Sequence, residues 1–361
     1  MPWRICSLRV VSRRLRSPPC HSYFSRGCQQ LRHDSSTSKP PPASRQAGSH
    51  AHEDNASSSS TEEKPIDPRL PDLGRLIEND YAAFQSHYST PKHPIVLAHG
   101  LLGFDELHLL PGSLFPSIHY WRGIKDAFSR NNIECITTTV PRTGSIEQRA
   151  AALSEQIASR AKGRDINIVA HSMGGLDARY LISRIYSGAQ KPSPPFRVRS
   201  LTTIATPHHG SSAADMLFRD IGPDLLPRIY AMLDRLSIDS GAFQQLTTSY
   251  VNEHFNPAVP DDPDVRYFSY GATATPHLFS VFRLSHDLMT ITEGPNDGLV
   301  SVRSSHWGEY KGTLVGVTHL DLINWTNRIK RVAARLGFVQ ERFNAVAFYL
   351  GVADMLAKEG F

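Results

Sequence analysis

The chain has 361 residues, of which 40% are hydrophobic and 20% charged, a balance typical of a globular protein with a sizeable core. No run of apolar residues approaches the ~20 needed to cross a bilayer, so we expect no integral membrane span. Residues 1–50 carry nine Lys or Arg and one acidic residue, which gives this segment a net charge of +8. Because the formal net charge of the whole chain is +5, the remaining residues carry a net charge of −3. A basic tail on a slightly acidic domain gives no reason to expect a nucleic-acid partner.

Residues 1–33 have the composition of a mitochondrial transit peptide. Met1 to Arg32 contain seven arginines, five serines and no acidic residue, with apolar residues scattered among them. An apolar core of about 7–15 residues, which a secretory signal needs, is lacking. We therefore expect a mitochondrial location for a soluble or peripheral protein, and the alternative is a basic tail without a targeting role. Cys135 is the one cysteine beyond this tail, so we expect no internal disulfide framework and a reducing compartment.

We expect residues 34–69 to be a disordered, low-complexity linker. Runs such as Pro40 to Pro42 and Ser57 to Ser60 leave too few apolar side chains to form a core. The folded domain is therefore expected to cover residues 70–361.

Strand-like and helix-like segments alternate along this domain. Short apolar runs rich in β-branched residues predict buried strands. They lie at residues 94–98, 135–140, 166–169, 198–205, 266–270 and 313–317. Helical patterns occupy residues 146–161 and, as a closing amphipathic helix, about 342–358. The alternation predicts an α/β fold with a mostly parallel sheet and helices on both faces.

The stretch from Val169 to Gly175 predicts a sharp strand-to-helix turn that presents a serine. Small residues stand two positions before and two positions after Ser172, as such a turn requires for steric reasons. The turn lifts Ser172 Oγ out of the sheet and leaves the next N–H free at a helix N-terminus. Ser172 is therefore the predicted nucleophile, and the alternative is a serine that caps an ordinary helix.

A serine nucleophile needs an imidazole base and a carboxylate that orients the base. In hydrolases with this turn, the order along the chain is Ser, acid, His. Asp297 lies in a Pro-Asn-Asp-Gly turn, and His319 directly follows the predicted strand at 313–317. Both positions are loops at strand ends, so we expect Asp297 as the acid and His319 as the base.

The 17 histidines of the chain include rivals for the base. His286 beside Asp287 and His306 beside an aromatic residue stay open as alternatives. His208 and His209 precede every candidate acid, which is the wrong order.

The negative oxygen that develops during acyl transfer requires preorganised N–H donors. One donor is expected from the residue after the nucleophile, Met173. The other is expected from the loop after the first long strand, where Gly100 allows the backbone to turn inward. We assign it to the Leu101 N–H, and the alternative is that His99-Gly100 is only a turn.

Residues 213–236 carry apolar side chains at mainly four-residue spacing, interrupted by Gly222-Pro223. The pattern predicts two short amphipathic helices inserted after a strand. They either cover the core as a fixed layer or form a mobile apolar lid over a pocket.

Several sequence blocks, in this order, resemble true lipases of the Pseudomonas and Burkholderia type. These blocks are Leu97 to Phe104, Ala170 to Gly175, Ala205 to Ser211, Asn296 to Val300 with Ser304 to Gly308, and His319 to Asp321. With its basic leader, the whole chain is similar to fungal mitochondrial triacylglycerol lipases of that family. The resemblance covers about residues 93–325 and implies an α/β-hydrolase fold with a lid at about 212–245. It also implies the triad Ser172, Asp297 and His319, with Leu101 and Met173 as oxyanion donors.

Two departures from the bacterial pattern bear on bound metals and disulfides. Arg303 stands where the bacterial enzymes have a disulfide-forming cysteine, which agrees with a reducing compartment. Asp321 matches one of their calcium ligands, but Trp325 replaces a glutamine four residues further on. Because calcium needs six to eight oxygens, we expect no metal here and no cofactor.

We therefore expect a serine carboxylester hydrolase that acts on acylglycerols through an acyl-enzyme on Ser172. The lid would then provide peripheral contact with a membrane or lipid-droplet surface. A phospholipase, a thioesterase or an acyltransferase would use the same triad. A non-catalytic lipid-binding protein with this fold is a further alternative.

Overall fold

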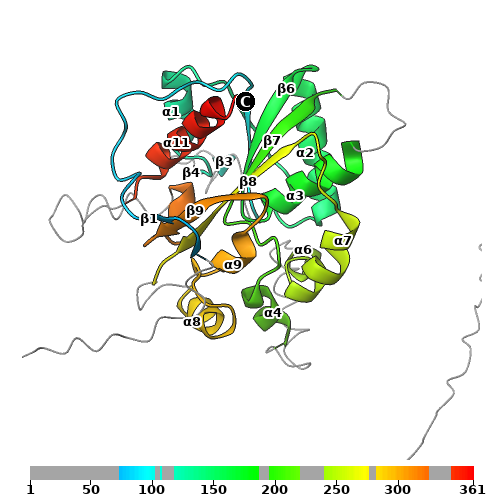
Figure 1. Ribbon diagram of the computed structural model, residues 1–361. Helices are drawn as coiled ribbons and strands as arrows, with labels where there is room; N and C mark the ends of the chain where they lie inside the picture. Colours follow the sequence, from blue (N-terminus) through cyan, green and yellow to red (C-terminus); the bar gives the residue numbers. More distant parts are fainter. Residues whose placement is uncertain are drawn as a thin grey trace, which may run out of the picture. The chain divides into compact units, whose positions relative to one another are not determined.

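A seven-stranded parallel sheet forms the centre of the fold (Figure 1). In a computed structural model of the protein the strand order is β1-β9-β8-β7-β6-β2-β5, and all neighbouring strands run parallel. The strands are β1 Leu76–Ile77, β2 Ile95–Ala98, β5 Cys135–Thr137, β6 Asp165–His171, β7 Arg197–Ile204, β8 Arg266–Thr273 and β9 Glu309–Val315. A separate antiparallel pair consists of β3 Glu106–Leu107 and β4 Ile118–His119. Each predicted strand is present, and the predicted α/β architecture is confirmed.

The structure describes the greater part of one compact unit, Glu63–Phe361. The described ranges are 73–101, 106–107, 118–186, 195–219, 240–275, 282–324 and 343–361. The predicted transit peptide at 1–33 and linker at 34–69 lie outside these ranges and stay predictions. Residues 220–239, which are most of the predicted lid, lie outside them too. No helix within the described ranges is long and apolar enough to cross a membrane.

Helices cover both faces of the sheet, and the alternation of side chains along the strands explains why. In β2, Ile95 and Leu97 belong to the core beneath α1 Ile124–Arg130 and α11 Ala345–Lys358. The intervening Val96 and Ala98 point to the opposite core, beneath α2 Ile146–Ala161. All four residues of β2 are buried, as expected for a parallel strand covered on both sides.

The bounds of α2 agree with the sequence pattern, because the local signals at its start are strong. Ser145 is the N-cap residue and accepts a hydrogen bond from the Gln148 N–H. The Gln148 side chain in turn accepts the Ser145 N–H, which completes a capping box.

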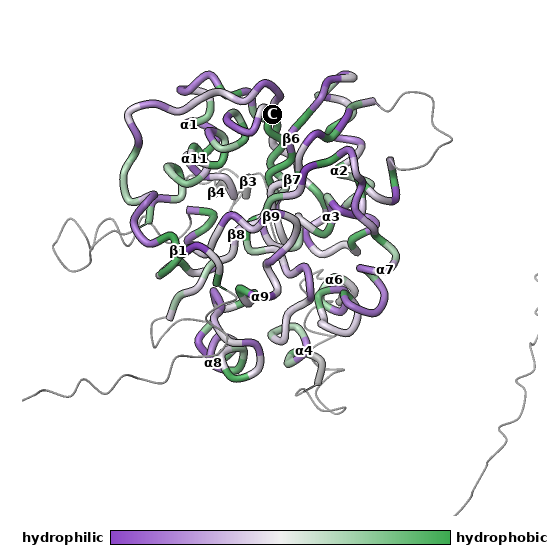
Figure 2. The backbone as a smooth tube through the Cα atoms, in the orientation of Figure 1, coloured by the Kyte–Doolittle hydropathy of each residue, from purple (hydrophilic) through white to green (hydrophobic). Residues whose placement is uncertain are grey.

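The closing helix differs from its prediction in character. The expected amphipathic helix at about 342–358 is α11, and it is buried around its circumference: all residues from Ala347 to Asp354 are buried. Figure 2 shows hydrophobic residues along α11 and β6. The Phe348 ring meets the rings of Tyr81 and Tyr270 edge-on, at centroid distances of 5.1 and 5.2 Å. Chain from the start of the domain also covers the polar face, since the Ser89 N–H donates to the buried Asp354 Oδ1 at 2.8 Å.

The remaining helices gather at the carboxyl ends of the strands (Figure 1). They are α4 Ser212–Arg219, α6 Ser240–Gln244, the π-helix Tyr250–Phe255, α7 Asn256–Ala258, α8 Arg283–Thr292, α9 Val302–Ser305 and the 3₁₀ turn Asp321–Ile323. Helix α3 Gly174–Tyr180 follows β6 directly and continues as a π-helix over Leu181–Tyr186. Because β2 and β6 are neighbours, the loops that leave their carboxyl ends meet, and open α/β sheets place their sites at such loops.

Candidate active site

The turn between β6 and α3 holds Ser172 in a left-handed backbone conformation, with a φ of 56°. Such a φ is uncommon for a residue with a side chain, and it persists only where surrounding contacts impose it. Here the Ser172 N–H donates to the Ile204 carbonyl at 3.0 Å. The Ser172 carbonyl accepts the Thr206 hydroxyl at 2.8 Å. The end of β7 therefore fixes the turn on both sides of the serine.

Two glycines bring the loop after β2 close to this turn. A Cβ atom on Gly100 would lie 2.7 Å from Ser172 Cβ, and one on Gly174 would lie 2.7 Å from the Ala98 and His99 carbonyl oxygens. Real Cβ atoms do not approach so closely, so both positions exclude larger residues. The first small position of the turn, Ala170, fits as an alanine because it lies inside the sheet, paired with Ala98.

Asp297 and His319 form a buried pair. His319 Nδ1 lies 2.7 Å from Asp297 Oδ2, and the His319 N–H donates to the Asp297 carbonyl at 3.1 Å. The other carboxylate oxygen accepts the N–H groups of Leu299 and Val300. Asp297 is fully buried. A carboxylate held this way orients the imidazole with its proton on Nδ1, which leaves Nε2 free to accept another.

The ring of His319 packs against that of His171, with 4.5 Å between their centroids. Because His171 immediately precedes Ser172, this contact places the histidine–aspartate pair beside the serine turn. The structure thus brings together Ser172, His319 and Asp297, the three residues expected from the sequence. Their catalytic roles stay predictions.

The rival histidines have other surroundings. His286 lies on α8, with Nδ1 3.0 Å from Asp287 of the same helix. His306 stacks on Tyr310, with 3.6 Å between the centroids. His208 is fully buried against the Thr203 hydroxyl, and burial lowers its pKa well below the usual value. Each has a structural contact of its own, and the His319–Asp297 pair alone combines a buried carboxylate with a place beside the serine turn.

The loop after β2 carries Leu101, the predicted oxyanion donor, and it is held at several points. Its Gly100 N–H donates to the Tyr120 hydroxyl at 3.1 Å, and that hydroxyl is 2.7 Å from His171 Nδ1. One tyrosine therefore links the loop to the strand that ends at the serine. Leu101 is partly buried against an apolar cluster that includes Met173, the other predicted donor. The two predicted donors thus adjoin the same turn.

Burial sets the charge state of the histidines in this region. It lowers the pKa of His171 well below its usual value. Electrostatic repulsion from His319 lowers this pKa further, against the opposing effect of a hydrogen bond with the His319 main chain. It also lowers the pKa of His99 to about 4, with a further contribution from the Arg149 guanidinium. Both imidazoles are therefore neutral near pH 7.

Arg149, Asp177 and Tyr120 are site residues that the sequence analysis missed. Arg149 and Asp177 form a buried ion pair, with 2.8 Å between Nη2 and Oδ2, directly behind the loop after β2. A signal for Arg149 was present, because it lies on the apolar face of its helix between Ile146 and Leu153. No comparable signal marks Tyr120, whose contacts are 20 and 51 residues away.

Asp321, which matches a calcium ligand of the lipases that the sequence resembles, has structural partners of its own. Asp321 is buried, and its Oδ2 accepts both the N–H and the hydroxyl of Thr318, at 3.0 and 2.7 Å. No group of three His, Cys, Asp or Glu side chains suited to a metal ion occurs among the residues described. Trp325, at the position of the expected glutamine, lies outside them.

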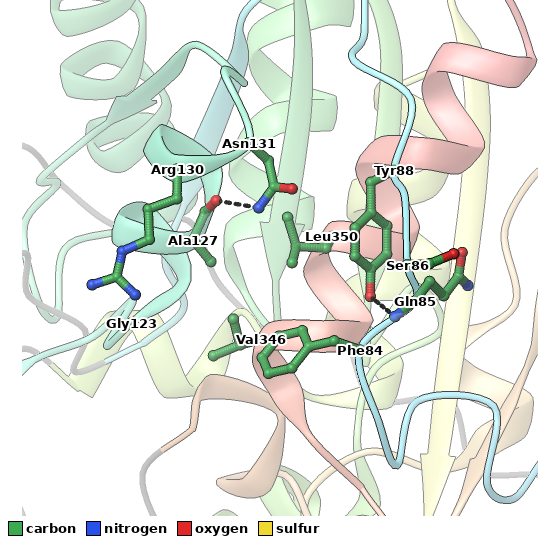
Figure 3. A pocket seen from close by; sticks show the side chains of 10 residues that line it. All are labelled: Phe84, Gln85, Ser86, Tyr88, Gly123, Ala127, Arg130, Asn131, Val346 and Leu350. Carbon is green, nitrogen blue, oxygen red and sulfur yellow. Dashed lines mark hydrogen bonds between the residues drawn. The ribbon is translucent and has the colours of Figure 1, made fainter.

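A cavity of about 370 Å³ lies away from these residues, between α1, α11 and residues 84–88 (Figure 3). Its lining includes Phe84, Tyr88 and Leu350. None of the candidate site residues lines it, so this cavity is separate from the serine turn.

A parallel α/β sheet that carries a strained serine between β6 and α3, beside a buried histidine–aspartate pair, defines a serine hydrolase of the α/β-hydrolase fold. Comparisons with known proteins agree. The family described as "Putative serine esterase (DUF676)" matches residues 88–233. The lipase of Staphylococcus hyicus has the same fold, with a TM-score of 0.55 at 19% identity, over 76% of this chain and 98% of that one.

Closer relatives are found by sequence. The chain is 38% identical to Triacylglycerol lipase 2 of Saccharomyces cerevisiae over 319 residues, covering 76% of this chain and 94% of the yeast protein. It is 28% identical to Triacylglycerol lipase of Vibrio cholerae, covering 68% of this chain and 83% of that protein. The chain belongs to the family of the yeast lipase, a family of serine lipases with the α/β-hydrolase fold. The predicted fold and carboxylic ester hydrolase class are confirmed.

The close approach of Gly100 to Ser172 generates the first prediction. Gly100→Ala should lower kcat for a soluble ester about 100-fold, because the new Cβ would clash with Ser172 Cβ at 2.7 Å and displace the loop that carries the predicted oxyanion donor. Steady-state kinetics on the purified variant measures the effect. Gly163→Ala is the control for a loss of stability alone. A Cβ there meets nothing within 4 Å but is strained by the φ of 83°, so this variant should keep the wild-type kcat. A Gly100→Ala enzyme with wild-type kcat would contradict the assignment of this loop.

Proposed function

We propose that the chain hydrolyses acylglycerol esters through an acyl-enzyme on Ser172, with His319 as the base and Asp297 as the orienting acid. The observation that carries the proposal is the buried His319–Asp297 hydrogen bond of 2.7 Å beside a serine in a left-handed conformation. Leu101 and Met173 supply the backbone N–H donors of the oxyanion hole. The contact of Gly100 with Ser172 supports their placement.

In the acylation step, Ser172 Oγ attacks the ester carbonyl carbon while His319 Nε2 takes the hydroxyl proton. The carbonyl oxygen becomes an oxyanion, which the Leu101 and Met173 N–H groups stabilise. Asp297 stabilises the charge on the imidazolium without taking its proton. When the tetrahedral intermediate collapses, the C–O bond to the alcohol breaks and His319 returns the proton to the leaving oxygen.

Deacylation repeats these events with water as the nucleophile. His319 removes a proton from the water as the water attacks the acyl carbonyl, and it then protonates Ser172 Oγ as the ester bond to the enzyme breaks. The products are a fatty acid and the partly deacylated glycerol. Replacement of water by another acyl acceptor at this step would give an acyltransferase on the same residues.

Two relatives support a triacylglycerol substrate, because each is named a triacylglycerol lipase. The same triad also serves phospholipases and thioesterases. A panel of purified triacylglycerol emulsion, phospholipid vesicles and an acyl-thioester separates these substrates. We expect the triacylglycerol emulsion to be turned over fastest.

The proposed nucleophile is tested by Ser172→Ala. Hydrolysis of a chromogenic ester should fall about 10⁴-fold or more, because removal of the nucleophile leaves only binding and the oxyanion hole. Covalent labelling by a fluorophosphonate probe should be lost. Ser159→Ala, at an exposed serine of α2, is the control and should keep both. Labelling that persists in Ser172→Ala would contradict the assignment of Ser172. A wild-type protein that takes no label would instead favour the alternative of a non-catalytic lipid-binding protein.

We also propose that residues at about 212–245 form a lid that contacts a lipid surface. Its described start, α4, packs against α8: the Ser212 N–H donates to Glu293 Oε1 at 2.6 Å, and Ser212 Oγ is 3.0 Å from Thr292 Oγ1. Exposure of an apolar lid face is favourable at a lipid aggregate and unfavourable in water.

Helix α8 supports this contact by presenting apolar side chains to solvent. Leu284 and Ile291 are 72% and 80% exposed, and their spacing of seven residues puts them on one face of the helix. The helix is joined to the acid loop, since Ser285 Oγ donates to the Gly298 carbonyl at 2.6 Å. An apolar face next to the loop of Asp297 would bring a lipid surface to the mouth of the site.

The double variant Leu284→Ser/Ile291→Ser tests this face. Turnover of a triacylglycerol emulsion should fall about tenfold or more, because two large apolar side chains no longer enter the lipid phase. Turnover of a monomeric short-chain ester should not change. Phe84→Ser, at a 59% exposed position near the cavity of Figure 3, is the control. Equal losses on both substrates would show a defect in the site itself and contradict the surface role.

We propose a mitochondrial location, supported by the acid-free, arginine-rich composition of residues 1–33. A fluorescent protein fused behind these residues should colocalise with a mitochondrial dye. Replacement of Arg4, Arg9, Arg13 and Arg14 by Glu should make the fluorescence diffuse, because import selects positively charged leaders. Diffuse fluorescence from the unchanged leader would contradict the proposal.

A further inference from the structure

Arg149 is a fully buried cation that connects three separate parts of the site. Its Nε and Nη2 lie 2.9 and 2.8 Å from Asp177 Oδ2, on the helix that follows Ser172. Nη2 also donates to the His99 carbonyl at 2.9 Å, in the loop after β2. Nη1 donates to the Pro141 carbonyl at 2.6 Å, in the loop after β5. One rigid guanidinium thus ties the oxyanion loop to the nucleophile helix.

We propose that the buried Arg149–Asp177 pair is a positioning device that holds the oxyanion loop in its catalytic conformation, and that turnover depends on the pair more than folding does. This inference rests on the proposed role of the Leu101 N–H as an oxyanion donor.

The hydrogen bonds of His99 show how the pair acts on that N–H. His99 Nε2 accepts the Val140 N–H at 3.1 Å, so the proton of this neutral ring is on Nδ1. Nδ1 then donates to the Gly100 carbonyl at 2.9 Å. That carbonyl and the Leu101 N–H belong to one trans peptide and point in opposite directions. The His99 side chain therefore sets the direction of the oxyanion donor, and Arg149 holds the His99 main chain.

The opposite side of the loop is in contact with the same helix. A Cβ on Gly174 would lie 2.7 Å from the His99 carbonyl oxygen, the atom to which Arg149 donates. The loop therefore rests against the start of α3, and Asp177, within the first turn of α3, anchors the guanidinium from the helix side. A negative charge in the first turn is also favoured by the helix dipole.

The electrostatics of the pair favour a role other than stability. Burial raises the pKa of Asp177 to about 6 against the opposing effect of Arg149, and Glu147 on α2 raises it further. The second carboxylate oxygen, Oδ1, is buried without a hydrogen-bond partner among the residues described. A buried pair with such desolvation contributes little net stability, and replacing both partners by apolar residues is often neutral. The pair instead maintains the position of the His99 main chain, to which Arg149 donates a hydrogen bond.

Two variants separate positioning from folding. Arg149→Met/Asp177→Leu removes both charges together and avoids an uncompensated buried charge. Arg149→Lys keeps the charge beside Asp177 but lacks the fork that reaches three acceptors. On folded protein, checked by circular dichroism and a cooperative melting transition, each variant should lower kcat for a soluble ester about 10- to 100-fold with KM nearly unchanged.

A second readout is specific to the oxyanion hole. Affinity for a trifluoromethyl ketone, which forms a tetrahedral adduct with the nucleophilic serine, should fall in parallel with kcat. The control is Arg164→Met/Glu134→Leu, which removes an exposed bidentate pair at the amino ends of β5 and β6 and should change neither quantity.

The outcomes separate the inference from the function on which it rests. The positioning role is supported if kcat falls and inhibitor binding weakens at constant KM in a folded Arg149→Met/Asp177→Leu or Arg149→Lys variant. The inference is overturned if either variant folds and keeps the wild-type kcat. It is also overturned if kcat falls while the affinity for the inhibitor stays unchanged. A wild-type enzyme that takes no fluorophosphonate label overturns the proposed function instead.

Discussion

The left-handed turn at Ser172 is the constraint to which the rest of the site is fitted. Its backbone conformation is strained. Hydrogen bonds with the end of β7 hold the turn in this conformation, and the lack of side chains at Gly100 and Gly174 lets the loop after β2 pack closely against it. Because β2 and β7 flank β6 in the sheet, both neighbours of the serine strand contribute to holding the turn. The position of the proposed nucleophile is therefore a property of three adjacent parallel strands.

Much of this arrangement follows from local sequence signals. Apolar runs followed by a small-residue turn identify β2 and β6, and the order of residues along the chain selects Asp297 and His319 over the other acids and histidines. The parallel topology then brings these residues together, because loops from the carboxyl ends of parallel strands meet at one edge of the sheet. The 2.7 Å contact between Asp297 and His319, 22 residues apart, lies at that edge.

Features that depend on distant contacts were beyond sequence reasoning. The closing helix α11 was expected to be amphipathic, but Tyr81, more than 260 residues earlier, packs its ring on Phe348. Asp177 sits in an ordinary helical pattern, and its partner Arg149 is 28 residues away on another helix. Only the unexplained charge on an apolar helix face pointed to such a pair, and it did not identify the partner.

The reaction proposed for Ser172 places a positive charge on His319, beside imidazoles that burial keeps neutral. His171 and His99 are kept neutral by burial, and the charge of Arg149 is matched by Asp177 at 2.8 Å. If His319 takes the serine proton as proposed, its imidazolium is paired with the Asp297 carboxylate at 2.7 Å. A protonated His171, with its ring 4.5 Å from that of His319, would oppose this charge directly. The burial of His171 against Tyr120 thus supports the proposed chemistry as well as the packing of the turn.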